Sequence, residues 1–225
     1  MPRADAEREH EVSPARSGRT LILACGALAH EIVALQRANG WDRFSVQCLP
    51  AELHNRPAEI PERVRAGIRK ARQHFDHVFV AYADCGTGGL LDRVLEEEGV
   101  ERLPGAHCYQ FFAGGRHFEE LAAEEPGTFY LTDFLARHFE RLLVRGMGLD
   151  RHPELHSLMF GNYTRLLYLA QTEDPELQAR ARAAAEYLGL RYEYRFTGYG
   201  ELESTLTRVN TEAAVGEKVI EWRRS

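Results

Sequence analysis

Soft metal ligands stand close to the ends of separate apolar segments of this sequence. Cys25, His54 and Cys85 each follow such a segment within a few residues, and Cys108 stands in a later stretch that we expect to be extended. Thiolate and imidazole are ligands that zinc prefers, and iron accepts a similar set. We therefore expect these four residues to hold a zinc or iron ion, although no Cys-x-x-Cys pair typical of a compact zinc finger occurs.

A glycine-rich turn surrounds one of these thiols, in the segment Asp84–Gly89 (DCGTGG), and a predicted helix follows it. Free backbone amides at the start of a helix favour an anion and make a cysteine more acidic. We expect Gly86, Thr87 and Gly88 to bind an anionic group of a small substrate, with Arg56 clamping its carboxylate. The alternative is that the glycines only permit a tight turn and that Arg56 is an exposed loop residue.

Two residues near the thiols are candidates for proton transfer. His107 is adjacent to Cys108, and neighbouring side chains of an extended segment point to opposite sides. We therefore expect Cys108 to be the ligand, and His107 and Asp84 to be the catalytic acid–base groups. Asp133 follows a later apolar segment, and its expected role is to cap the next helix.

The elements that would position these residues alternate between strand and helix. The apolar runs that predict strands are Thr20–Ala24, Phe44–Leu49, Asp76–Ala83, Thr128–Leu131, Arg165–Ala170, Leu190–Phe196 and, at the end, Lys218–Trp222. Helical spacing is found in Leu28–Ala38, Pro61–His74, the stretch from Gly89 to Glu97, Phe118–Glu124, Asp133–Val144 and Pro175–Leu188. This alternation predicts an α/β fold with a mostly parallel sheet and helices on both faces. Two βαβ lobes separated by a cleft are the second possible arrangement.

The carboxyl ends of parallel strands share one edge of a sheet, where ligands of such folds bind. Cys25, His54, Cys85 and Asp133 all follow predicted strands, so we expect them at this edge. Cys48 lies within a predicted strand instead, and we interpret it as a core residue.

Composition narrows the class of protein. The chain has 225 residues, a net charge of −6 and 44% hydrophobic residues, which suits one α/β domain over residues 19–225. The charged residues 1–18 predict a disordered tail and contain no secretory signal. Without a basic patch or a long apolar run, we expect neither nucleic acid nor a membrane as a partner, and we expect a cytoplasmic protein with free thiols.

Four motifs together resemble the DUF1638 family, a domain of unknown function, over about Thr20 to Phe196. These motifs are Cys25–Leu28, Leu53–Asn55, Asp84–Gly89 and Pro104–Tyr109. Members of the family occur beside corrinoid proteins and corrinoid-dependent methyltransferases, so the resemblance implies methyl-group metabolism, with a corrinoid reached only through a partner protein. The family is expected to carry an acidic residue after the His-Cys-Tyr triplet, where this chain has Gln110.

Three functional hypotheses follow. The first is a metal-dependent transferase or hydrolase, whose zinc- or iron-bound thiolate or water reacts with the substrate. The second is a non-catalytic accessory protein that binds a metal or another ligand. The third is a metal-free enzyme in which Cys85 is the nucleophile and His54 or His107 is its base.

Overall fold

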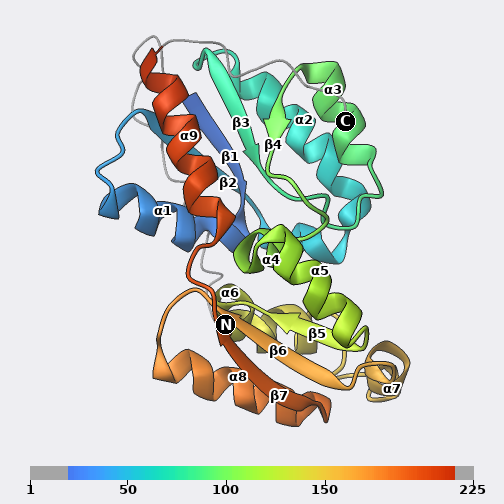
Figure 1. Cartoon of the computed structure of the whole chain (residues 1–225). Helices are drawn as coiled ribbons and strands as arrows, with labels where there is room; N and C mark the ends of the chain where they lie inside the picture. The colour runs from blue at the N-terminus through green and yellow to red at the C-terminus, as the bar shows by residue number, and fades with distance from the viewer. Residues whose placement is uncertain (1–19, 216–225) are drawn as a thin grey trace, which may run out of the picture.

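The chain forms two lobes, each built on its own parallel sheet (Figure 1). The computed structural model describes residues 20–215, so the predicted tail 1–18 and the predicted strand Lys218–Trp222 lie outside the described residues. The first sheet has the strand order β2-β1-β3-β4 and the second the order β5-β6-β7. The predicted α/β fold with parallel sheets is confirmed.

The elements have the following bounds. The strands are β1 (Thr20–Cys25), β2 (Phe44–Leu49), β3 (His77–Ala81), β4 (Glu101–Arg102), β5 (Thr128–Leu131), β6 (Arg165–Ala170) and β7 (Arg191–Phe196). The α-helices are α1 (Ala29–Ala38), α2 (Ile60–Ala71), α3 (Leu90–Glu98), α4 (Cys108–Ala113), α5 (Gly115–Glu124), α6 (Asp133–Phe139), α7 (Glu154–Phe160), α8 (Pro175–Leu188) and α9 (Glu201–Val215). Short 3-10 turns are η1 (Gly26–Leu28), η2 (Ala51–Asn55) and η3 (Pro57–Glu59), and η4 (Glu140–Arg145) is a π-helix.

The first sheet is covered on both faces, which is why β1 is apolar along its whole length. All six residues of β1 are buried. Helices α2 and α3 lie on one side of the sheet, and α1 and α9 lie on the other (Figure 1). The fit to α2 is close, because a Cβ on Gly67 would lie 2.7 Å from Cδ2 of Leu23. The C-terminal helix α9 contributes Leu202, Leu206 and Val209 to this core, so the chain returns to its first lobe.

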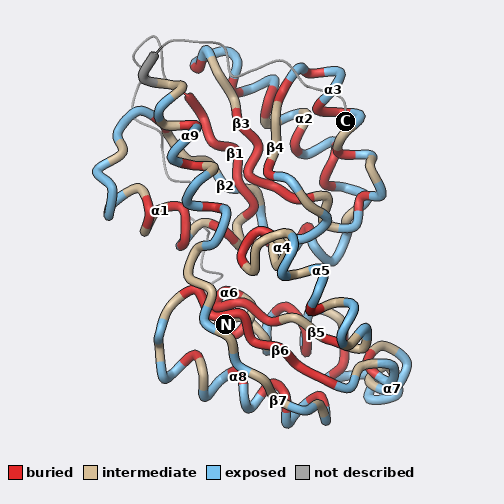
Figure 2. The backbone as a smooth tube through the Cα atoms, in the orientation of Figure 1, coloured by how far each residue is buried: buried red, intermediate tan, exposed pale blue. Residues whose placement is uncertain are grey.

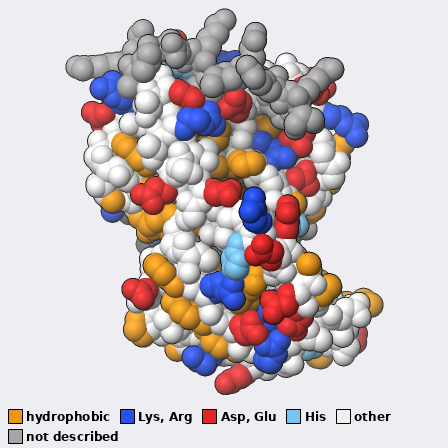
Figure 3. Space-filling model, viewed as in Figure 1, with side chains coloured by type: hydrophobic (Ala, Val, Ile, Leu, Met, Phe, Trp, Pro, Cys, Tyr) orange, Lys and Arg blue, Asp and Glu red, His pale blue; other side chains and the backbone are white. Residues whose placement is uncertain are grey.

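In the second lobe, the side chains of successive residues of β6 point alternately to the two faces of the sheet. Leu166, Tyr168 and Ala170 pack with α6 and α8, whereas Leu167 and Leu169 pack beneath α5. Figure 2 shows that buried residues concentrate on the central strands β1, β3 and β6. Figure 3 shows a narrow waist between the lobes and a mixture of acidic and basic side chains on the viewed face.

The carboxyl edge of the first sheet faces the second lobe. Ala51, in the turn after β2, packs against Phe134 of α6 and Leu142 of η4. The loops that follow β1 and β2 are therefore held against the neighbouring lobe through Ala27 and Ala51, and side chains in them meet residues from the distant half of the sequence.

Several predicted features differ in the structure. Cys48 is exposed, not a core residue, because β2 is an edge strand of its sheet. Asp133 follows a strand of the second sheet, so it does not share the edge that carries Cys25 and Cys85. Leu103–Tyr109 was expected to be extended, but the strand β4 lies just before it, at Glu101–Arg102, and Cys108 already begins α4.

Candidate functional site

His54 lies among three thiols at the carboxyl edge of the first sheet. Cys25 ends β1, and its Sγ lies 3.8 Å from Nδ1 and 3.9 Å from Nε2 of His54, which stands in η2. Cys85 follows β3, and this thiol raises the pKa of the same imidazole. The pKa of Cys108 responds to the charges of Cys85 and Cys25, so the fourth predicted ligand belongs to the same neighbourhood.

The imidazole of His54 has a defined orientation. Nδ1 lies 3.0 Å from the carbonyl oxygen of Ala51. Because a carbonyl can only accept, Nδ1 carries the hydrogen and Nε2 is left as the basic nitrogen. Burial alone lowers the pKa of His54, but the hydrogen bond and charge of Cys85, together with the Ala51 carbonyl, raise the pKa above its ordinary value. His54 is exposed as a residue, so a bound molecule can reach it and exchange protons with it.

Cys85 occupies a strained position directly after a buried strand. Among residues 20–215 it is the non-glycine residue with a positive φ, at +52°. A side chain in this left-handed region costs about 1–2 kcal/mol. Two backbone hydrogen bonds hold the strand exit in place, from Cys85 N to Ala106 O at 2.8 Å and from Asp84 N to Gly105 O at 3.1 Å. The half-buried thiol is thereby presented at a sharp strand-to-helix turn, as nucleophiles of some hydrolases are.

The glycine-rich turn already binds an anion, and that anion is the carboxylate of Asp84. The amides of Gly88 and Gly89 donate to it at 3.1 and 2.9 Å, and Oγ1 of Thr87 donates at 2.5 Å. Burial opposes ionisation of Asp84, but these donors and Arg102 lower its pKa below the ordinary value. Asp84 therefore organises the turn as a carboxylate, and its geometry gives no support to the predicted role as a proton donor.

Gly86 is the member of this turn that remains open to a substrate. It is exposed, and its N–H forms no hydrogen bond within the described part of the chain. Thr87 is buried, and its hydroxyl also accepts from the Leu91 amide at 3.3 Å. Of the three residues predicted to bind substrate here, Gly86 and Gly88 are exposed and Thr87 is not.

His107 and Arg56 lie at the margin of the site. His107 is exposed, and burial of part of its ring lowers its pKa, as does His54, while Asp84 opposes this effect. The side chain of Arg56 is 73% exposed and pairs with Glu59 at 3.5 Å. Neither position tests the role that was predicted for it. The acid–base role of His107 and the binding of a carboxylate by Arg56 therefore stay predictions.

Gln110, where an acidic residue was expected, has a structural role. Its Oε1 accepts from the Ala106 amide at 2.9 Å, and a Cβ on Gly105 would lie 2.7 Å from that oxygen. The same loop supplies the carbonyls that hold Asp84 and Cys85. Gln110 thus stabilises the loop that positions the thiol.

Asp133 does not cap α6, contrary to the prediction. Thr132 is the N-cap, and its hydroxyl accepts from Leu135 N at 3.4 Å. The fully buried carboxylate of Asp133 instead accepts from the Tyr168 hydroxyl at 2.7 Å and from both Gln171 N and Thr172 N at 3.0 Å. Asp133 thus joins the start of α6 to the end of β6. A capping pattern involves only neighbouring residues, so it does not predict this long-range contact.

The two remaining thiols of the site are held in the neutral form. Burial raises the pKa of Cys25 to about 12, although the Ala27 amide donates to its sulfur at 3.3 Å. Tyr82, which is fully buried, lowers the pKa of the same thiol and so opposes the effect of burial in part. Burial and then the charges of Cys85 and Cys25 raise the pKa of Cys108. Neither is suited to be a free thiolate nucleophile.

The predicted metal ligands have the right chemistry for zinc but not a closed arrangement. Three thiols and one imidazole share the neighbourhood, as predicted from the carboxyl ends of β1, β2 and β3. Within residues 20–215, however, no group of three or more His, Cys, Asp or Glu side chains is placed to hold a metal ion. Metal binding by these residues would require their side chains to move closer to a common centre.

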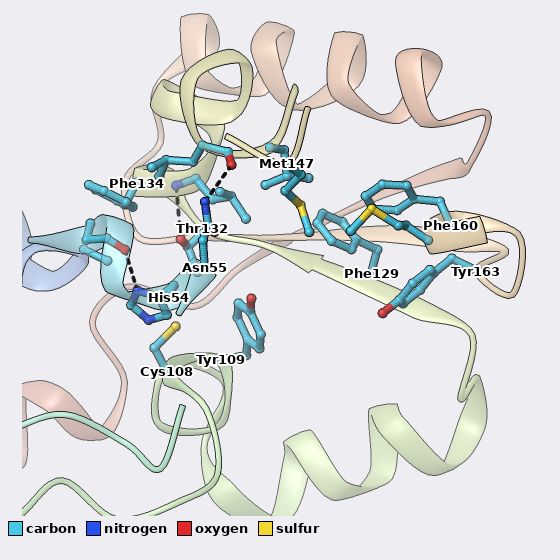
Figure 4. A pocket seen from close by; sticks show the side chains of 16 residues that line it. His54, Asn55, Cys108, Tyr109, Phe129, Thr132, Phe134, Met147, Phe160 and Tyr163 are labelled. Carbon is cyan, nitrogen blue, oxygen red and sulfur yellow. Dashed lines mark hydrogen bonds between the residues drawn. The ribbon is translucent and has the colours of Figure 1, made fainter. Parts of the chain in front are cut away.

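A cavity of about 370 Å³ adjoins the site between the two lobes (Figure 4). His54 and Cys108 stand at one end of it, and Phe129, Phe160 and Tyr163 stand at the other. Its full lining comprises Ala27, Ala51, His54, Asn55, Cys108, Tyr109, Phe129, Thr132, Phe134, Leu135, Leu142, Leu143, Met147, Met159, Phe160 and Tyr163. Most of these residues were missed by sequence reasoning, because only the packing of one lobe on the other brings them together.

Comparison with known proteins identifies the family alone. The family profile described as "Protein of unknown function (DUF1638)" matches residues 48–206, a range that contains His54, Cys85 and Cys108 but not Cys25. No curated protein and no solved structure matches the chain. None of the described helices has the length and apolar character needed to cross a bilayer.

Proposed function

Because this chain belongs to the DUF1638 family, whose description names no activity, we propose a function from the site itself. The protein is a cysteine-dependent enzyme of acyl transfer or hydrolysis, with Cys85 as nucleophile and His54 as general base. This corresponds to the metal-free hypothesis drawn from the sequence, and it selects His54 over His107 as the base.

One observation carries the proposal: the His54 imidazole is fixed at Nδ1 by the Ala51 carbonyl, and its pKa is raised by the neighbouring Cys85 thiol. A nucleophile, a base near it and a third group that orients the base form the arrangement used in covalent catalysis. The strain at Cys85 supports the same assignment, since unfavourable backbone conformations gather at functional sites. The exposed position of His54 and the half-buried thiol let a substrate reach both groups.

The proposed reaction begins when Sγ of Cys85 attacks an acyl carbon and Nε2 of His54 takes the thiol proton. The former carbonyl oxygen gains the negative charge, and the free N–H of Gly86 is available to stabilise it. As the oxyanion collapses, the bond to the leaving group breaks, and the leaving group takes the proton from His54. Water or another acceptor, deprotonated by His54, then attacks the thioester and returns Cys85 as a thiol.

A zinc- or iron-dependent enzyme is the second candidate, and the gathering of Cys25, Cys85 and Cys108 around His54 favours it. A metal bound there would supply a stabilised thiolate, which is a good methyl acceptor. The expected link to a corrinoid protein or methyltransferase belongs to this candidate and rests on the family resemblance. We rank it second because the described donors do not form a metal-holding group.

The proposal is tested by the release of nitrophenol from p-nitrophenyl acetate in protein purified under reducing conditions without added metal. We expect a rapid burst of about one equivalent per chain, which is the kinetic sign of an acyl-enzyme. The burst is lost in Cys85→Ala. In His54→Asn it slows by roughly 100-fold, because the amide still donates to Ala51 but cannot act as a base.

The matched control is Cys48→Ala, which removes an exposed thiol away from His54 and should leave the burst unchanged. A full burst in Cys85→Ala would overturn the proposal. Elemental analysis of the same preparation separates the two candidates: stoichiometric zinc or iron that is lost in Cys85→Ala, together with activity abolished by a chelator, would favour the metal-dependent enzyme.

A further inference from the structure

The cavity between the lobes has an apolar wall. Aromatic and aliphatic side chains form most of the lining, including Phe129, Phe134, Met159 and Phe160, and no Asp, Glu, Lys or Arg lines it among the described residues. Methionine side chains adapt to ligands of different shape, and Met147 and Met159 both contribute. Such a cavity favours the burial of uncharged apolar groups and disfavours anions.

Most polar groups of the cavity lie near His54, the proposed base. His54 and Cys108 stand at one end, with Asn55, Thr132 and Tyr109 close by (Figure 4). Phe129, Phe160 and Tyr163 form the opposite end (Figure 4), and Met159, next to Phe160 in the chain, also lines the cavity. A ligand with a reactive polar head and an apolar tail can therefore place its head at His54 and its tail among the aromatic rings.

The size of the cavity limits the tail. A volume of about 370 Å³ lies at the small end of the range for small-molecule sites. This volume corresponds to roughly 12 water molecules, at ~30 Å³ for each molecule in the liquid. This is enough for a medium-length alkyl chain or a substituted aromatic ring.

From these features we infer that the substrate is an uncharged acyl compound with a medium-length alkyl or aromatic tail, and that the inter-lobe cavity binds this tail. The assignment of the acyl head rests on the proposed function. The assignment of the apolar tail rests on the cavity alone. It replaces the small anionic partner predicted from the sequence, because the glycine turn is filled by Asp84 and Arg56 pairs with Glu59 outside the cavity lining.

The first test uses p-nitrophenyl esters from acetate to octanoate. Each methylene buried in the cavity should raise kcat/KM about fourfold, until the cavity is full. The variant Met159→Trp fills the cavity, so it should abolish the rise of kcat/KM with chain length. Its matched control is Leu158→Trp at the preceding residue of α7, whose side chain is exposed and lies outside the cavity lining; it should keep the rise. An unchanged chain-length profile in Met159→Trp would overturn the inference.

A second test does not depend on catalysis. Phenylnaphthylamine, a neutral fluorophore, should bind the full chain and brighten well above neutral pH, where the His54 imidazole is uncharged. Its sulfonated anionic analogue should bind at least roughly tenfold more weakly, since no Lys or Arg among the described residues lines the cavity. Binding of the neutral probe should be lost in Met159→Trp and kept in Leu158→Trp. Equal or tighter binding of the sulfonated probe would contradict the inference.

The two proposals fail separately. Binding of the neutral probe without any acetate burst would refute the catalytic role of Cys85 and retain the apolar cavity as a ligand site. A burst that depends on Cys85, with no probe binding and no effect of chain length, would retain the enzyme and refute the substrate class.

Discussion

Glu31 gives the structure a pH dependence that can be calculated. This residue of α1 is 3% exposed, and its Oε2 has no hydrogen-bond partner within the described part of the chain. Burial raises its pKa from 4.5 to about 7, and the nearby Asp133 carboxylate adds to the increase. The backbone amide of Glu31 and the Arg137 guanidinium oppose it more weakly. Glu31 therefore remains largely protonated until the pH approaches neutrality.

The sign and size of the effect follow from proton binding. Between pH 4.5 and 7 the folded chain holds a proton on Glu31 that the unfolded chain has released, so the free energy of unfolding falls as the pH rises. The difference between the two pKa values corresponds to about 3 kcal/mol, all of which is lost above pH 7.

The variant Glu31→Gln isolates this contribution, because an amide has nearly the same shape and does not ionise. We expect its unfolding free energy to equal that of the wild type near pH 4 and to exceed it by about 3 kcal/mol at pH 8. Urea denaturation followed by circular dichroism at a series of pH values measures the difference. A difference that does not change with pH, or a variant less stable than the wild type at pH 8, would refute the reasoning.

Three further predictions concern residues of the two lobes. Asp133→Ala should lower the unfolding free energy by about 3 kcal/mol or more, because several buried donors lose their acceptor; urea denaturation measures this, and a loss below about 1 kcal/mol would contradict it. Cys85→Gly should raise thermal stability by about 1 kcal/mol while it abolishes the burst, since glycine relieves the positive φ; calorimetry showing a less stable variant would argue against strain. Cys25 should react with iodoacetamide more slowly than Cys48, because Cys25 is buried and its pKa is raised to about 12, whereas Cys48 is exposed and its pKa is raised to about 11; peptide mass spectrometry gives both rates, and faster labelling of Cys25 would contradict the assignment.

The strands could be predicted because their apolar runs are short and continuous. Those of β1, β2, β5 and β6 have nearly the bounds that were expected. Their parallel pairing follows from the helices between them, and this brought Cys25, His54 and Cys85 to one edge of one sheet. A local pattern does not show where one sheet ends and the next begins, which is why Asp133 was assigned to the wrong edge.

Other features depend on interactions that a linear pattern does not contain. Asp84 was interpreted as a catalytic group. Its carboxylate accepts hydrogen bonds from the amides of Gly88 and Gly89, in the turn whose amides were expected to be free for a substrate. The orientation of His54 depends on the 3-10 turn that brings the Ala51 carbonyl to Nδ1, in a stretch predicted to be a loop. The apolar cavity arises only when Phe129 and Phe160 of the second lobe face His54 of the first.

The central claim is that Cys85 forms a covalent intermediate with the help of His54. The most direct measurement is mass spectrometry of the protein quenched during turnover of p-nitrophenyl octanoate, followed by peptide mapping. The account predicts one octanoyl group per chain, attached to Cys85 and absent from His54→Asn quenched at the same time. Acylation of Cys108 or Cys25 in its place, or turnover without any acylated cysteine, would contradict it.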